Sequence, residues 1–254
     1  MTERSVMDSL GDSTMRSFTT AAAPLPTATR TFRLHRTNRT FTILDMRPAG
    51  EFCWMDIKTP DLDATGRELD AVLGWECVVD PEDRRDPATA RKARFEGHWM
   101  AGLSSLHSGA YPPGTEPHVS YYVAVVDAVH AHDAAVDEGA TSVIPPSPIA
   151  GLGVLATVVD PFGATVSLWQ PGRFAGWTHP AIPGAPRRMV HTSITPTAAA
   201  GFYRDRLGLP LTGAVFSTRT GEPPAWTAVI QVADRPATAF APLRLPSGHV
   251  FLFA

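Results

Sequence analysis

The sequence predicts an α+β fold built from tandem βαβββ units. The first observation is a repeat: segments 56–75 and 190–209 share a short strand, a Thr-Pro turn, an alanine-containing helix and a Leu-Gly stop. The second observation is the series of short strands after each helix, separated by turns rich in glycine and proline. A local order that is used twice indicates a duplicated supersecondary unit.

The first unit begins with an apolar strand over 52–58, which Pro60 ends because proline cannot donate a backbone hydrogen bond to a sheet. Asp61 stands at a favoured N-cap of the following helix, and Gly74 supplies its C-terminal stop. A strand at 75–79 comes before a charged loop over 80–94, and two strands within 95–106 follow this loop and complete the unit.

The second unit repeats this order with a strand over 118–126 and a helix over 127–140 that Gly139 closes. After a proline-rich loop, two strands over 153–159 and 164–170 meet at the tight turn Asp160-Pro-Phe-Gly163. The third unit has a strand over 189–195, a helix over 197–207 and strands near 211–217, 225–232 and 236–241. Residues 249–254 then begin a further strand that is similar to 118–123.

These elements predict four segments along the chain. We expect a disordered or extended leader over 1–45, a first domain of two units over 46–171 and a Pro/Gly-rich linker over 172–188. A partial second domain, one unit plus the start of another, occupies 189–254. Two alternatives for the leader are a basic arm and an extension that precedes a natural start at Met46.

Composition excludes several function classes. The net charge of −3 and the pI near 6.3 give no general attraction to nucleic acid or to a membrane surface. Cys53 and Cys77 are too few for a disulfide framework or a cysteine-based zinc site. Since no apolar run reaches the roughly 20 residues of a membrane span and no secretory signal is visible, we expect a cytoplasmic protein.

Four motifs carry a resemblance to a known family: Trp54-Met-Asp-Ile-Lys-Thr-Pro-Asp61, Leu73-Gly-Trp75, Tyr122-Val-Ala-Val-Val-Asp127 and Asp160-Pro-Phe-Gly-Ala-Thr-Val-Ser-Leu-Trp-Gln170. In their order and spacing they resemble the vicinal oxygen chelate superfamily, which contains glyoxalase I, bleomycin-resistance proteins and extradiol dioxygenases. The two-domain actinobacterial branch is the most similar. The resemblance implies a glyoxalase-like fold with curved mixed sheets, helices on the convex face and a concave cup that binds small molecules.

In the metal enzymes of this family, His, Glu or Gln ligands project into the cup from the first and last strands of the units. The matching positions here are Trp54 (or Met55 in a shifted register), Ser120 and Ser167, with His118 on the same strand face as Ser120. These side chains do not suit a hard divalent ion. We therefore expect no metal site and no cofactor in the first domain.

His191 is the exception, because it stands at or next to the ligand position of the third unit. Its partners would belong to a fourth unit, for which His249 is the nearest candidate. His191 thus remains a weak candidate ligand for a divalent ion such as Fe, Mn, Ni or Zn, in a site that another subunit would complete.

The predicted cup has aromatic walls and a few polar groups, which suits a flat or hydrophobic organic molecule. Its candidate ligand-binding residues are Trp54, Asp56, His118, Ser120, Tyr122, Ser167 and Trp169. Asp56 is also a candidate catalytic base, because an apolar cup would raise the pKa of its carboxyl. The alternative is that Asp56 accepts hydrogen bonds from backbone or tryptophan N–H groups.

The favoured function is metal-independent binding of a small molecule, with sequestration of, or action on, a secondary metabolite or antibiotic. An alternative is an enzyme of the same fold, a lyase, an isomerase or a hydroxylase- or dioxygenase-like protein, that uses Asp56 as base or a metal at His191. A further alternative is a homodimerising interaction protein, since an unpaired half-domain exposes a sheet edge and an apolar face. A homodimer is expected in either case, and whether the protein catalyses a reaction is left open.

Overall fold

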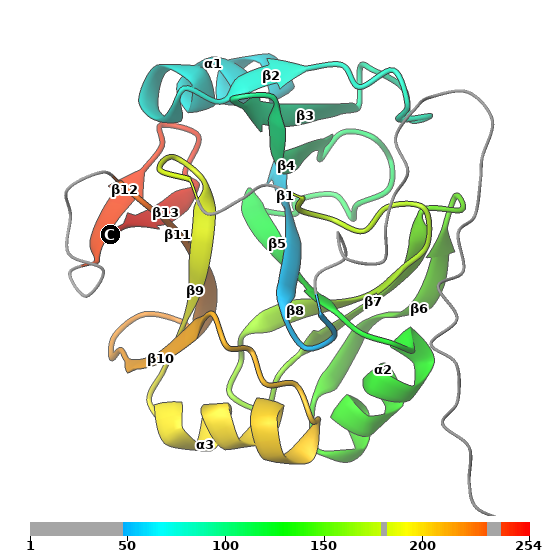
Figure 1. Cartoon of the computed structure of the whole chain (residues 1–254), viewed down its shortest axis with the longest axis vertical. Coiled ribbons are helices and arrows are strands. Elements are labelled where there is room, and N and C mark those ends of the chain that lie inside the picture. The colour runs from blue at the N-terminus through cyan, green and yellow to red at the C-terminus, as the bar shows by residue number, and fades with distance from the viewer. Residues whose placement is uncertain (1–47, 179–181, 233–239) are drawn as a thin grey trace, which may run out of the picture. The chain divides into compact units, whose positions relative to one another are not determined.

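The computed structural model describes residues 48–178, 182–232 and 240–254 (Figure 1). The predicted leader over 1–45 and most of the predicted strand near 236–241 lie outside the described residues. The described chain forms two mixed sheets with helices beside them. The predicted α+β class with βαβββ-like units is confirmed.

The first sheet contains eight strands in the order β2-β3-β4-β1-β5-β8-β7-β6. Its strands are β1 Phe52–Thr59, β2 Glu76–Val78, β3 Ala90–Phe95, β4 His98–Ser105, β5 His118–Ala124, β6 Thr141–Ile149, β7 Gly153–Val159 and β8 Thr165–Pro171. The first strands of the two units, β1 and β5, pair antiparallel at the centre. Each also pairs parallel with the last strand of its own unit, so the two halves repeat one topology.

Two capped helices lie beside this sheet. Helix α1 (Leu62–Leu73) begins where the Asp61 side chain accepts from the Ala64 N–H, and it ends at Gly74, whose φ of 67° is left-handed. Helix α2 (Ala128–Asp137) begins in the same way, with the Asp127 side chain as the N-cap acceptor. Helix α1 packs against β2, β3 and β4, and α2 packs against β6, β7 and β8. Both predicted helices are therefore present, and α1 has the predicted caps Asp61 and Gly74, whereas the C-cap of α2 is Glu138, one residue before the predicted Gly139.

The second sheet has five strands in the order β10-β9-β11-β13-β12. Its strands are β9 Pro186–Ser193, β10 Ala214–Thr218, β11 Ala225–Ile230, β12 Ala241–Arg244 and β13 Val250–Phe253. Between β9 and β10, helix α3 (Pro196–Gly201) continues as a π-helix over Phe202–Arg206. Here too two central strands, β9 and β11, pair antiparallel, and each has a parallel neighbour.

This pairing changes the interpretation of the C-terminal strand. Strand β11 holds the place beside β9 that β5 holds beside β1. Strand β13 pairs parallel with β11, as β8 pairs with β5. The 249–254 segment therefore matches a last strand of a unit, not the first strand that its similarity to 118–123 predicts, because partner strands decide the place of a short apolar segment.

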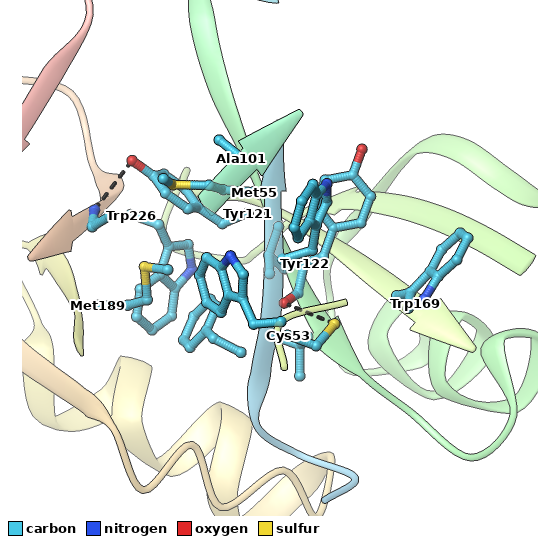
Figure 2. Close-up of a cluster of buried hydrophobic side chains, with 14 of the residues drawn as sticks. Cys53, Met55, Ala101, Tyr121, Tyr122, Trp169, Met189 and Trp226 are labelled. Carbon is cyan, nitrogen blue, oxygen red and sulfur yellow. Dashed lines mark hydrogen bonds between the residues drawn. The ribbon is translucent and has the colours of Figure 1, made fainter. Parts of the chain in front are cut away.

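The two sheets are joined by specific contacts (Figure 2). The Tyr121 hydroxyl accepts from the Ala228 N–H at 3.1 Å, and the Phe52 and Trp226 rings lie 4.9 Å apart. Figure 2 shows Tyr121 directed toward the strand of Trp226 and Tyr122 directed away from it. Alternate residues of β5 thus serve different faces of the first sheet.

The segment that follows β8 is packed onto the first sheet. The Trp177 N–H donates to the Cys53 carbonyl at 2.6 Å, and its indole N–H donates to the Met100 carbonyl at 2.7 Å. Gly176 has a φ of 91°, and a Cβ there would lie 2.1 Å from the Cys53 carbonyl oxygen. The first part of the predicted linker is therefore part of the folded core. Among the helices of the described residues, none is long and apolar enough to cross a membrane.

Candidate functional site

We use the term site face for the face of the first sheet that carries Trp54, Asp56 and Lys58 of β1. The other face carries Thr59, whose hydroxyl lies 2.7 Å from that of Thr65 in α1. The site face continues onto β5, since Trp54 pairs with Tyr122 in the antiparallel register. Strand alternation therefore brings the predicted residues of β1 and β5 together on one face, as a strand period of two requires.

A buried ion pair occupies the centre of this face. The Lys58 ammonium donates to Asp56 Oδ2 at 2.6 Å, and each side chain is less than a tenth exposed. The Ser104 hydroxyl contacts both Asp56 oxygens, at 3.2 and 2.9 Å. Gly102, the β4 partner of Asp56, leaves the room for this carboxylate, because a Cβ there would lie 2.9 Å from Oδ1. The cluster is thus built into the sheet.

Further polar groups surround the pair. The Arg85 guanidinium donates to the Ser104 hydroxyl at 3.1 Å and forms its own salt bridge with Asp83. The Lys58 ammonium lies 5.3 Å from the centre of the Tyr111 ring.

The charges of the cluster are coupled. Burial by itself lowers the pKa of Lys58, but the Asp56 carboxylate outweighs it and holds that pKa well above its ordinary value. Burial, together with the Asp56 charge, raises the pKa of Tyr122 to about 12 against the opposing effect of Lys58. At neutral pH the site face therefore presents a charged ammonium and a neutral phenol.

Aromatic rings line one side of the cluster. The Trp54 ring lies 4.8 Å from Phe174, and the Trp169 indole N–H donates to the Phe174 carbonyl at 2.9 Å. The Tyr122 and Trp169 rings lie 6.2 Å apart in an edge-to-face arrangement. These contacts combine two predicted strand residues with a ring from the segment after β8.

The other predicted residues are placed as follows. Ser167 shares a hydrogen bond of 2.8 Å with Thr157, its neighbour on β7. Ser120 lies opposite Asp56 in the β1–β5 register, and His118 lies opposite Lys58 at the exposed start of β5. The His118 ring contacts the Glu116 carbonyl at 2.9 Å. All seven predicted ligand-binding residues thus lie on strands of one sheet, but only Asp56 belongs to the charged cluster.

Lys58, Arg85, Tyr111 and Phe174 were not among the residues predicted from the sequence. Lys58 had a visible signal, because a lysine two residues from Asp56 in an otherwise apolar strand must share its face. Arg85 and Tyr111 come from irregular segments, and Phe174 comes from the supposed linker, so no periodicity marks them.

The donor groups of this cluster do not fit the divalent metal that the fold family implies. Both Asp56 oxygens are already hydrogen-bonded, and the adjacent ammonium would repel a metal ion. Over the described ranges, no group of three or more His, Cys, Asp or Glu side chains is placed to hold a metal.

His191 lies in the interior, between the two sheets. Its Nε2 lies 2.9 Å from Asp160 Oδ2, which also accepts from the Tyr203 hydroxyl at 2.7 Å. His249 has different neighbours: its Nε2 lies 2.9 Å from the Lys58 carbonyl oxygen, and β11 separates β9 from β13. The two histidines therefore do not share a site in this chain.

Two surface hollows lie elsewhere. One of about 330 Å³ lies at the start of α1 and is lined by Pro60, Asp61, Leu62, Asp63, Ala88, Arg91 and Ser105. The other, of about 450 Å³, is apolar and is lined by residues that include Phe95, Ile230 and Phe253. Neither is lined by Asp56 or Lys58. Arg85 and Tyr111, which contact the cluster, are at least partly exposed.

No family model matches the chain. The anthracycline biosynthesis protein DauV of a Streptomyces species is 26% identical over 172 residues, which cover 63% of this chain and 61% of that protein. CFP32 of Mycobacterium tuberculosis, provisionally named a glyoxylase, is 28% identical over 156 residues, which cover 61% of this chain and 59% of that protein. The match thus spans about three fifths of the length of these relatives.

Solved structures show the same fold. The Mn(II)-bound glyoxalase from Novosphingobium aromaticivorans matches with a TM-score of 0.54 and 13% identity, over 81% of each chain. The homoprotocatechuate 2,3-dioxygenase from Arthrobacter globiformis matches with a TM-score of 0.51 and 14% identity, over 81% of this chain and 80% of that one. These solved structures show that the chain has a glyoxalase-like fold, and the relatives found by sequence are similar to it over about three fifths of its length.

Proposed function

We propose that this protein binds a flat aromatic small molecule on the site face of its first sheet, without a metal ion. In this role it sequesters, or acts on, a secondary metabolite or antibiotic. The observation that carries the proposal is the Asp56–Lys58 pair, which stands on the same sheet face as the rings of Trp54, Tyr122 and Trp169.

Charged groups in such a place have a cost. A buried ion pair loses much of its hydration, and apolar side chains of similar volume are often as stable or more stable. The sequence nevertheless places Asp56 and Lys58 in a strand whose other residues are mostly apolar. A perturbed charged pair beside aromatic rings is a functional-site candidate on these physical grounds.

The relatives support the ligand class. Two Streptomyces relatives bear names from anthracycline biosynthesis, and anthracyclines are flat, polycyclic and rich in ring oxygens. Rings such as Trp54 and Trp169 pack well against molecules of that shape. The predicted homodimer and the cytoplasmic location stay predictions.

The test uses dihydroxyanthraquinone as a probe and protein that has been treated with a chelator. We expect the probe to quench tryptophan fluorescence and Trp54→Phe to weaken its binding by about tenfold, a loss of roughly 1.4 kcal/mol. The matched control is Trp226→Phe, because Trp226 packs between the two sheets. Equal effects of the two substitutions would contradict the location, and stoichiometric Fe, Mn, Ni or Zn that is lost in His191→Ala would contradict metal independence.

A second candidate is an enzyme that uses Asp56 as a base, with Lys58 beside it to stabilise an oxyanion. The specific observation in its favour is the 2.6 Å contact between a carboxylate and an ammonium on one sheet face. Asp56→Asn separates the two candidates. An enzyme would lose turnover of its substrate while it keeps binding, whereas a binding protein has no turnover to lose.

A further inference from the structure

We propose that the Lys58 ammonium and the Tyr122 hydroxyl anchor an oxygen anion of the ligand, so that the site selects aromatic acids. The shared chemistry is an oxygen anion on an aromatic ring system, either a carboxylate or an ionised phenol. This inference rests on the proposed function and names the substrate class of the same site.

Lys58 has more N–H donors than it uses within the described structure. A lysine ammonium has three N–H donors. Within the described part of the chain, Asp56 Oδ2 is the one hydrogen-bond acceptor in contact with Lys58 Nζ, at 2.6 Å. The Tyr111 ring, 5.3 Å away, offers a π face and not a lone pair. Two N–H groups of a nearly buried ammonium thus remain for an acceptor from outside.

The Asp56 carboxylate holds the Lys58 ammonium in place. Its carboxylate accepts from Lys58 and from the Ser104 hydroxyl, and Ser104 accepts in turn from Arg85. This chain of donors fixes Asp56, and Asp56 fixes the ammonium. The carboxylate therefore acts as a positioning group that holds Lys58 on the site face.

The Tyr122 hydroxyl is a second hydrogen-bond donor on the site face. Its side chain stands on the same face as Asp56 and Lys58, and the residue is only 9% exposed. Among the residues described, no protein atom is hydrogen-bonded to the Tyr122 hydroxyl, and this oxygen is not among the fully buried polar atoms that lack a partner, so it is open to solvent. The hydroxyl is therefore a second donor for a ligand oxygen.

The groups around Lys58 favour a ligand with a negative charge. The acidic groups nearby are already paired, Asp56 with Lys58, Asp83 with Arg85 and Asp80 with Lys92. What remains on Lys58 and Tyr122 is N–H and O–H donors, which favour an anionic acceptor. A ligand cation would meet the repulsion of the ammonium at short range.

The experiment compares naphthoate with its uncharged analogue naphthamide by calorimetric titration of the whole protein. We expect naphthoate to bind at least about tenfold more tightly, because hydrogen bonds between charged groups are about twice as strong as neutral ones.

The variant is the charge-neutral pair Asp56→Asn with Lys58→Met, which leaves no unpaired buried charge and so avoids the main cause of misfolding. We expect this double variant to abolish the preference for naphthoate. The control is Glu138→Gln with Arg206→Met, which removes an ion pair that lies outside the site face and should keep the preference.

Three results would overturn the inference. If both probes bind equally well to the native protein, the anion site is wrong while the proposed aromatic site stands. If the preference survives in the Asp56 and Lys58 double variant, or is lost equally in the control, Lys58 is not the anchor. If neither probe binds at millimolar concentration, the proposed function and this inference both fail.

Discussion

Asp56 and Asp160 are both buried carboxylates beside a basic side chain, but their surroundings differ. Asp160 accepts from the N–H groups of Phe162 and Ala164 through one oxygen and contacts Tyr203 and His191 through the other. All of these partners are internal. Asp56 holds Lys58, whose remaining donors have no described protein partner. The Asp160 carboxylate is thus fully paired inside the fold, although His191 Nδ1 has no partner in the described structure, whereas the donors left on Lys58 face the side where we propose that a ligand binds.

His191 and Lys58 are two different kinds of candidate functional residue. His191 stands at a ligand position of the family pattern, yet it is fully buried and packs at 4.8 Å from the Trp226 ring. Lys58 matches no family ligand, yet it lies at the centre of the site face. Residue type alone therefore does not identify a functional residue, because the groups that surround the side chain also count.

The largest expected effect is that of Asp160→Ala. This change leaves the buried groups of His191 and Tyr203 without their acceptor and removes the turn contacts, so we expect a loss of about 4 kcal/mol in the free energy of unfolding. Urea denaturation measures it. The control is Asp133→Ala, since Asp133 contacts His132 at 3.0 Å but is exposed, and its loss should stay below about 0.5 kcal/mol. Similar losses in both variants would remove the distinction between closed and exposed pairs.

A smaller loss of stability is expected for Lys58→Met. The change leaves the Asp56 charge without its main partner, although Ser104 still donates to it, and we expect a loss of about 2 kcal/mol. Adding Asp56→Asn should recover most of the loss, because the unpaired charge disappears. A double-mutant cycle by urea denaturation measures this coupling. An additive result would mean that the pair is not energetically coupled.

The smallest effect concerns pH and His249, whose ring contacts the Lys58 carbonyl at 2.9 Å. Burial lowers the pKa of His249 below its ordinary value of 6.5. Below that value the unfolded state binds the proton more readily, so this contribution to stability is complete above about pH 6.5 and decreases as the pH falls toward the lowered folded pKa.

His249→Gln isolates this contribution. The difference in free energy of unfolding between the native protein and the variant should be larger near about pH 8 than near about pH 5. A difference that is constant, or that grows as the pH falls, would contradict the sign. This measurement also tests whether the contact between the C-terminal segment and β1 forms in solution.

Local signals allowed β1, β2, β4, β5, β7 and β8 of the first sheet to be predicted, whereas β3 and β6 form where a charged loop and a proline-rich loop were predicted. Pro60, Asp61 and Gly74 mark the limits of β1 and α1 by backbone chemistry that neighbouring residues do not override. The alternation of β1 also predicts that Trp54 and Asp56 share a face. Such signals act within a few residues, which is why a single sequence contains them.

The rest depends on contacts between distant segments. Asp56 was predicted to have a raised pKa in an apolar cup or to accept from backbone or tryptophan N–H groups, whereas its partners are Lys58 and Ser104. Phe174 and Trp177 belong to a segment whose glycine and proline content predicts a linker, yet both contact the first sheet. Composition indicates a lack of regular structure, but it does not indicate a lack of packing.

The most direct test of the central claim is a calorimetric titration of dihydroxyanthraquinone into three samples: native protein, chelator-treated protein and the Asp56→Asn/Lys58→Met double variant. We predict the same affinity in the first two samples and a loss of at least about tenfold in the third. Binding that disappears on chelation and returns with added manganese, while the double variant binds normally, would contradict a cup whose cation is Lys58.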